Sequence, residues 1–154
     1  RELRGRLGRR EVLQVQLLRH RQRHRERQPE RERLLGDEPV RAFVRRALEI
    51  DGHAVTEARD GAEALEMLER DRGAYDLLLT DIRMPLMDGI ALALAAAPQF
   101  PDLVILLMTG YADQRERAHG LEALVHDVVT KPFSLADIRA KVTEALAAGP
   151  KRPA

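Results

Sequence analysis

The chain has 154 residues, 44% hydrophobic and 33% charged, and its lack of cysteine excludes disulfides, thiol catalysis and cysteine-based metal sites. Its apolar stretches, residues 90–98 and 103–108, are far shorter than the roughly 18 residues of a membrane span, and the N-terminus lacks a secretory signal, so we expect a soluble cytoplasmic protein. The net charge of +1 divides into +7 for residues 1–36 and −6 for the remainder.

The N-terminal segment is rich in arginine and low in complexity. Residues 1–36 carry 12 Arg against 5 Glu, with no aromatic residues among the basic ones and no recognisable DNA-binding motif. Such a segment is more typical of a solvated tail than of a nucleic-acid site. We therefore expect an extension over residues 1–33 that is disordered or artefactual, a domain over residues 34–148 and a tail over residues 149–154.

From residue 40 onward, predicted helices and strands alternate strictly. Apolar residues recur at helical spacing or form short apolar runs, and Gly, Pro and Asp mark the ends of these segments. Wholly apolar strands between helices predict a parallel sheet covered on both faces. The expected helices cover residues 40–50, 62–72, 90–97 (ended by Pro98 and Pro101), 112–124 and 135–148, and the expected strands cover residues 53–58, 77–80, 103–108 and 128–130.

Polar residues lie where the carboxyl ends of the strands should meet. Asp37 and Glu38 precede the first helix, whereas Asp81, Thr109 and Lys131 each follow an apolar strand. Clustered carboxylates repel one another unless a cation neutralises them, and oxygen ligands favour a hard ion such as Mg²⁺. A carboxylate beside such an ion can act as a nucleophile toward phosphorus, with a lysine and a hydroxyl stabilising the phosphate.

Three separated segments carry a resemblance to a known family. Residues 77–89 (LLLTDIRMPLMDG), 108–110 (MTG) and 130–133 (TKPF) resemble the phosphoacceptor segment, the switch hydroxyl and the Lys-Pro motif of CheY-like response-regulator receiver domains. Their spacing, 28 residues from Asp81 to Thr109 and 22 from Thr109 to Lys131, also fits. The resemblance implies a flavodoxin-like, doubly wound (βα)5 parallel sheet of strand order 2-1-3-4-5.

The resemblance also implies a role for each residue of the cluster. Asp81 would accept the phosphoryl group, Lys131 would pair with the phosphate, and Thr109 would move toward it. The peptide bond before Pro132 would be cis. The implied Mg²⁺ ligands are Asp37, Asp81 and the backbone carbonyl of Arg83, with Glu38 as the alternative acidic ligand.

The first strand departs from this family pattern. Receivers carry about five apolar residues directly before the acidic pair, but residues 30–36 here read ERERLLG, whose charges would be costly to bury in a central strand. We favour the explanation that residues 1 to about 33 are not the natural sequence, through a frameshift or a wrong start. Alternatively, residues 12–18, in which Leu13, Val15 and Leu17 alternate with Gln, supply the strand, and a long basic loop returns to Asp37.

A second departure concerns the aromatic residue that many receivers carry three positions before the lysine. That position is Val128 here, and Tyr111 is a partial substitute at most. We therefore do not expect the usual aromatic rotation in signalling.

The resemblance implies a non-enzymatic response regulator, phosphorylated on Asp81 with Mg²⁺ by a histidine kinase or phosphotransfer protein. Residues 109–133 look like the short single-domain cell-cycle regulators of alphaproteobacteria, so we expect output by protein contact, with a Clp-type protease as a candidate target. We expect no DNA-binding domain and no membrane association, and a homodimer stays open. The alternatives are a receiver fragment of a hybrid histidine kinase and a constitutive binding module that has lost phosphorylation.

Overall fold

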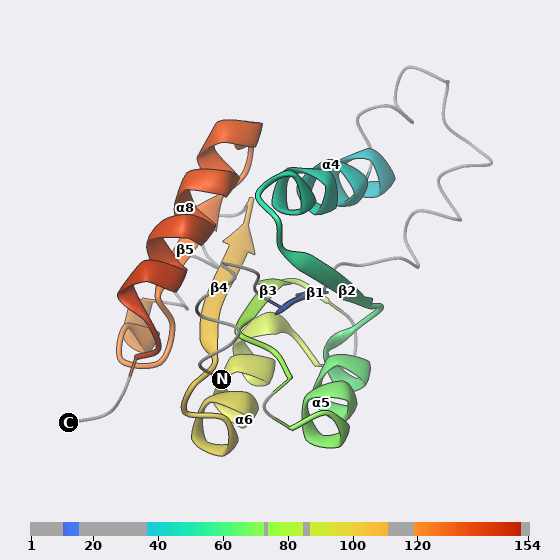
Figure 1. Ribbon diagram of the computed structural model, residues 1–154. Helices are drawn as coiled ribbons and strands as arrows, with labels where there is room; N and C mark the ends of the chain where they lie inside the picture. The colour runs from blue at the N-terminus through green and yellow to red at the C-terminus, as the bar shows by residue number, and fades with distance from the viewer. Residues whose placement is uncertain (1–10, 16–36, 73, 85–86, 111–118, 152–154) are drawn as a thin grey trace.

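A five-stranded parallel sheet forms the centre of the computed structural model, which describes residues 11–15, 37–72, 74–84, 87–110 and 119–151. The strands lie in the order β2-β1-β3-β4-β5, and each neighbouring pair is parallel (Figure 1). This order confirms the expected doubly wound α/β sheet. The strands are β1 (Glu11–Val15), β2 (Ala54–Ala58), β3 (Leu77–Asp81), β4 (Val104–Thr109) and β5 (Asp127–Thr130).

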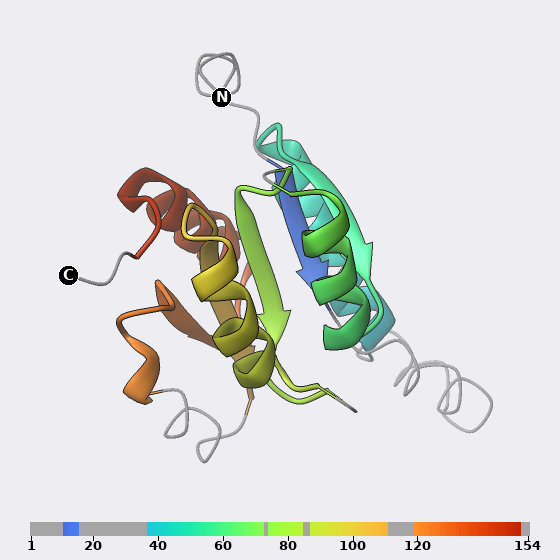
Figure 2. The ribbon, with the colours of Figure 1, turned by 90° about the horizontal axis from the view of Figure 1, so that it is seen from below.

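Helices cover the sheet in two layers. α4 and α8 pack on one face, and α5 and α6 pack on the other (Figures 1 and 2). Val44, Leu48 and Ile138 contribute to the first apolar interface, and Leu68 and Leu92 to the second. None of the described helices is long and apolar enough to cross a membrane. They are α4 (Asp37–Ile50), α5 (Gly61–Arg70), α6 (Gly89–Gln99) and α8 (Leu135–Ala148).

β3 and β4 are buried along their whole length, as their apolar sequences predict. Successive side chains point to opposite faces, so Leu77 and Leu79 pack toward α4 and α8, while Leu78 packs toward α5 and α6. The two strands stay in register as far as Asp81, which lies beside Met108. Both strands therefore end at the same edge of the sheet.

The central strand β1 comes from Glu11–Val15, far upstream of the acidic pair. It pairs with β2 on one side and with β3 on the other, and Val12 and Leu13 are fully buried on opposite faces. This agrees with the second explanation of the first strand. The favoured explanation, which left residues 1–33 outside the domain, does not account for β1. The rest of that extension, residues 1–10 and 16–33, lies outside the described residues.

Two helices differ from the expectations. α6 continues through Pro98 to Gln99, because the Phe100 amide still donates to the Ala96 carbonyl at 2.9 Å and a proline removes only one helical hydrogen bond. Most of the helix expected over residues 112–124 lies outside the described chain. Its described end is a 3₁₀ turn, η1 (His119–Leu121), followed by turns rather than by α-helix.

A salt bridge joins the end of α4 to α8. Arg139 Nη2 lies 2.6 Å from Asp51 Oδ1, and Arg139 Nε donates to both carboxylate oxygens at 3.1 Å. The hydrogen bonds from Arg139 hold the pKa of Asp51 below its usual 3.8, against the opposing effect of burial. Because the pair is partly exposed, it contributes alignment of the two helices more than stability.

The placement of β1 leads to a stability prediction. Replacing Leu13 with Ala should lower the free energy of unfolding by about 2–5 kcal/mol, because a fully buried leucine leaves a cavity. Leu94→Ala is the control, since Leu94 is 49% exposed and its truncation should cost no more than about 0.5 kcal/mol. Urea unfolding of both variants measures the difference. Equal stabilities of the two variants would mean that Glu11–Val15 does not supply the central strand.

Candidate functional site

The ends of β3, β4 and β5 bring three of the predicted site residues to one edge of the sheet. Asp81 is the last residue of β3, Thr109 is the last residue of β4, and Lys131 directly follows β5. The Lys131 amide donates to the Thr109 carbonyl at 2.7 Å, which continues the pairing of β4 and β5. The three residues are distant in sequence, so parallel pairing alone brings them together.

Asp81 and Lys131 form an ion pair across the end of β4. Lys131 Nζ lies 2.6 Å from Asp81 Oδ1, and the two side chains are 34% and 12% exposed, respectively. A nearly buried carboxylate would be costly without a counter-charge, which this lysine supplies. The lysine side chain is exposed enough to reach a ligand at the surface while it remains beside Asp81. The pair therefore combines a carboxylate nucleophile with a positive charge for an anion.

Thr109 and Pro132 also lie as the resemblance implies. Thr109 is 2% exposed at the end of β4, and the Lys131–Pro132 peptide bond is cis. Val128, at the position where the aromatic residue was missing, is half-buried and packs against the apolar cluster on the α5–α6 side. Tyr111 lies outside the described residues. In the register of β4 and β5, Val128 lies beside Leu107, and Thr109 lies beside Thr130.

The remaining predicted ligands are only partly described. α4 begins at Asp37, at the edge of the sheet where the strands end (Figure 2). The side chains of Asp37 and Glu38 lie outside the described part of the chain. Arg83 follows Asp81 in the loop after β3, and its side chain is exposed.

The chemistry of Asp81 fits a magnesium ion. Among the described residues, no group of three or more His, Cys, Asp or Glu side chains forms a ready metal cluster. Mg²⁺ does not require one, because it binds through one or two carboxylates and completes its octahedron with water and phosphate oxygens. Asp81 supplies a hard oxygen donor at an edge that α4 also reaches. The full ligand set implied by the resemblance, namely Asp81, the Arg83 carbonyl and Asp37 or Glu38, stays a prediction.

Gly89 holds the loop after β3 against the backbone of Asp81. A Cβ atom added to Gly89 would lie 2.2 Å from the Asp81 carbonyl oxygen, so only glycine fits there. The Gly89 amide donates to the Ile82 carbonyl at 2.7 Å, and Asp88 caps α6 by accepting from the Ala91 amide at 2.8 Å. The sequence did not predict this close approach, because the Asp88-Gly89 pair by itself indicates only a turn.

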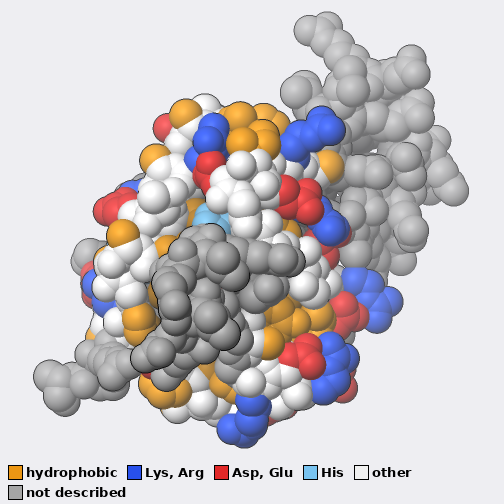
Figure 3. Space-filling view, in the orientation of Figure 1, with side chains coloured by type: hydrophobic (Ala, Val, Ile, Leu, Met, Phe, Trp, Pro, Cys, Tyr) orange, Lys and Arg blue, Asp and Glu red, His pale blue; other side chains and the backbone are white. Residues whose placement is uncertain are grey.

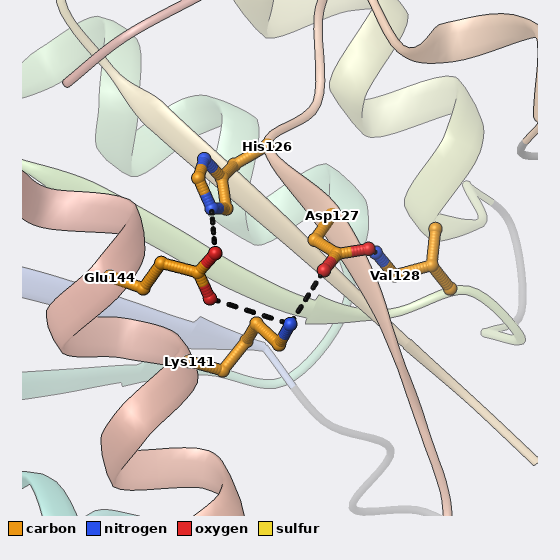
Figure 4. A network of polar contacts seen from close by, with 5 residues as sticks. All are labelled: His126, Asp127, Val128, Lys141 and Glu144. Atoms are coloured by element: carbon orange, nitrogen blue, oxygen red, sulfur yellow. Dashed lines mark hydrogen bonds and ion pairs between the residues drawn. The ribbon is translucent and has the colours of Figure 1, made fainter. Parts of the chain in front are cut away.

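A network of polar side chains lies on the outer side of β5. Lys141 Nζ donates to Asp127 Oδ2 at 2.8 Å and lies 3.4 Å from Glu144 Oε2 (Figure 4). The second carboxylate oxygen of Glu144, Oε1, lies 3.9 Å from His126 Nε2. Asp127 Oδ1 also accepts from the Val128 amide at 2.7 Å. The network borders an open cavity of about 420 Å³ between β5 and α8. It ties the edge strand to α8.

The pKa of Asp127 is lowered within this network. Burial raises it, but hydrogen bonds from Lys141 and from the Val128 amide outweigh burial, so the pKa lies below its usual 3.8. The hydrogen bond to Asp127 raises the pKa of Lys141 in turn. Both groups are therefore charged at neutral pH.

The face around these elements carries mixed charges. Acidic and basic side chains are interspersed over the visible surface of α4, α8 and their neighbours (Figure 3). A nucleic-acid site presents a continuous basic surface instead. The described part of this face therefore gives no support to nucleic-acid binding.

Comparisons with known proteins match this arrangement. Residues 36–143 match the family described as the response regulator receiver domain. Response regulator MprA of Mycobacterium leprae is 40% identical over 106 residues, which are 69% of this chain and 46% of that protein. MprA of Mycobacterium ulcerans is 39% identical over 106 residues, 45% of its length. The chain thus spans somewhat less than half the length of these curated relatives.

Solved structures show the same fold. A response regulator receiver domain protein from Clostridium thermocellum superposes with a TM-score of 0.69 at 17% identity, covering 90% of this chain and 94% of that chain. The receiver domain of Francisella response regulator 1452 gives 0.67 at 23% identity, covering 90% and 98%. TrrA from Thermotoga maritima, solved in complex with Mg(2+)-BeF, gives 0.67 at 23% identity, covering 88% and 98%. At these identities the likeness concerns the fold.

The contact between Gly89 and Asp81 yields a first prediction for this site. Gly89→Ala should lower the free energy of unfolding by about 1–3 kcal/mol, because the added methyl group overlaps the Asp81 carbonyl and forces the loop outward. Gly120→Ala is the matched control, since nothing lies within 4 Å of its added Cβ. Denaturant unfolding compares the two variants. A Gly89→Ala protein as stable as the control would show that the loop does not press on Asp81.

The lowered pKa of Asp127 yields a second prediction. Ionised Asp127 stabilises the fold above its unfolded pKa, so the advantage of the parent chain over Asp127→Asn should be largest near neutral pH and shrink as pH falls through and below 3.8. The advantage should stay below about 1 kcal/mol because the side chains are partly exposed. Chemical unfolding from pH 7 to pH 3 measures it. Glu69→Gln, an exposed carboxylate on α5, serves as control, and the same pH profile in both variants would refute the prediction.

Proposed function

Because this chain belongs to the response regulator receiver domain family of two-component systems, we propose that Asp81 accepts a phosphoryl group from the phosphohistidine of a histidine kinase or phosphotransfer protein. The observation that carries the proposal is the 2.6 Å contact between Asp81 Oδ1 and Lys131 Nζ at the carboxyl edge of the sheet. It places a nucleophilic carboxylate beside a cation at the point where three strands end.

The proposed step is a displacement at phosphorus. A carboxylate oxygen of Asp81 forms the new P–O bond while the P–N bond of the donor breaks, and the imidazole nitrogen keeps the electron pair and takes up a proton. Lys131 leaves part of its interaction with the carboxylate and stabilises the negative oxygens of the transferred group. The Thr109 hydroxyl donates a hydrogen bond to an oxygen of the transferred phosphoryl group. Asp81, the Arg83 carbonyl and Asp37 or Glu38 would hold Mg²⁺, which would supply charge neutralisation.

The change in charge at Asp81 is what a partner would sense. Phosphorylation replaces one negative charge with about two and adds three acceptor oxygens, so Lys131 and Thr109 gain a new partner. Both belong to the β4 and β5 ends, so we propose that the output is a protein contact formed near β5 and α8. A Clp-type protease, a second copy of the chain and further segments of a longer protein, including a hybrid kinase, are the candidate targets. We further propose that the protein acts in the cytoplasm as a signalling domain rather than as an enzyme.

One observation favours a second function. β1 ends at Val15, whereas Asp37 and Glu38 begin α4 after an interval of 21 residues. In the family pattern the acidic pair follows the first strand directly. A shifted acidic pair would weaken the Mg²⁺ site and leave a constitutive binding module that is not phosphorylated.

Phosphorylation can be measured directly. With Mg²⁺ and acetyl phosphate, the intact mass of the purified chain should increase by one phosphoryl group, and this gain should disappear without Mg²⁺ and in Asp81→Asn. Asp76→Asn, at the opposite end of β3, should retain it. Lys131→Ala should slow the reaction about a hundredfold because the developing charge loses its cation.

The result separates the two functions. Phosphorylation that requires Asp81 supports a working receiver, even though 21 residues separate β1 from the acidic pair. A folded chain that gains no phosphoryl group contradicts the proposal and favours the constitutive binding module.

A further inference from the structure

Thr80 places a hydroxyl group in an apolar layer directly before the phosphoacceptor. It is fully buried in β3, and its neighbours on the same face, Leu78 and Ile82, belong to the apolar cluster under α5 and α6. A buried hydroxyl is costly unless it forms a hydrogen bond. A valine would fill the same volume, so the role of Thr80 must be sought in what its oxygen contacts.

The Thr80 hydroxyl contacts the backbone of Asp81. Its Oγ1 lies 3.0 Å from the Asp81 carbonyl oxygen and 3.9 Å from Met84 Sδ. A hydroxyl has one proton to donate, and a carbonyl oxygen is a far better acceptor than a thioether. The structure therefore indicates that the hydroxyl donates to the carbonyl of Asp81, while Met84 closes the site from the loop.

Both polar atoms of the peptide group that follows Asp81 are thus held. Its carbonyl oxygen accepts from Thr80, and its amide, which belongs to Ile82, donates to the Met108 carbonyl at 3.0 Å. Gly89 lies close to the same carbonyl on the loop side, where a Cβ atom would overlap it. Because a peptide group is planar, holding its oxygen and its N–H fixes its orientation.

The orientation of this peptide bears on the reactive groups on either side of it. Its rotation changes the backbone angle ψ of Asp81, which tilts the carboxylate relative to Lys131. It also moves the start of the loop that carries the Arg83 carbonyl. Phosphoryl transfer depends on such positioning, and a misplacement of about 1 Å can cost on the order of a hundredfold in rate.

We propose that Thr80 is a positioning residue for phosphorylation, which acts by holding the Asp81–Ile82 peptide through its hydroxyl group. This inference rests on the proposed function of Asp81. It makes the hydroxyl, not the methyl group, the functional part of Thr80. A residue that only fills the core would show the opposite dependence, since its methyl group would matter and its hydroxyl would not.

Two substitutions separate the two parts of the side chain. Thr80→Val keeps the volume and removes the hydroxyl, whereas Thr80→Ser keeps the hydroxyl and removes the methyl group. Thr56→Val is the matched control, because Thr56 lies in β2, with β1 between that strand and β3. The rate of phosphorylation by acetyl phosphate with Mg²⁺ is measured by intact mass, and urea unfolding confirms that each variant is folded. The backbone amide signals of Ile82 and Arg83 are recorded by NMR without Mg²⁺ or phosphodonor.

The proposal predicts a slowing of about tenfold in Thr80→Val, together with displaced Ile82 and Arg83 signals. In Thr80→Ser, the rate of phosphorylation and the Ile82 and Arg83 signals should stay close to those of the parent chain, even if this variant is the less stable one. Thr56→Val should match the parent in both measurements. A parental rate in Thr80→Val, or equal slowing in Thr80→Ser, overturns the positioning role. If the parent chain is itself not phosphorylated, the proposed function of Asp81 fails and the role of Thr80 fails with it, a result distinct from a loss confined to Thr80→Val.

Discussion

The burial of β3 and β4 between two layers of helices is the constraint on which the rest of this structure depends. Apart from Thr80, neither strand has a polar side chain before its last residue, so both must occupy the interior of the sheet. Parallel pairing then places their ends at a common edge, where the last residues of the two strands, Asp81 and Thr109, lie near each other. The site is a consequence of where hydrophobic burial stops.

Charge and backbone geometry at this edge reinforce each other. Lys131 neutralises the nearly buried carboxylate of Asp81, while Thr80 and Gly89 contact the carbonyl of the same residue from the core and from the loop. The carboxylate is therefore constrained both through its side chain and through its own peptide. A carboxylate constrained in this way would need little rearrangement before the phosphoryl transfer that we propose for Asp81, and such positioning is the main contribution a protein makes to that reaction.

The start of the domain is where this chain departs from its family. The match to the receiver family begins at residue 36, yet the sheet contains β1 at Glu11–Val15, upstream of that match. A central strand must be apolar on both faces, and Val12 and Leu13 satisfy this requirement, whereas the charged residues 30–33 do not. The burial of apolar residues in the sheet thus separates the strand from the acidic pair in the sequence, and the magnesium site that we propose is the feature most affected by that separation.

The sequence by itself determined the class of fold and the strands from β2 to β5, and it predicted that Asp81, Thr109 and Lys131 meet at one edge of the sheet, because apolar periodicity and motif spacing are local properties of the chain. Only the tertiary structure decided which of two segments forms β1, that α6 continues past Pro98, and that Thr80 and Gly89 both contact the Asp81 carbonyl. The choice of β1 and the approach of Lys131 to Asp81 depend on residues far apart in the sequence, which meet only when the sheet has formed. The contacts of Thr80 and Gly89 depend on how the turn after β3 folds back on that strand. Tertiary packing fixes the path of this turn, and the amino-acid composition does not.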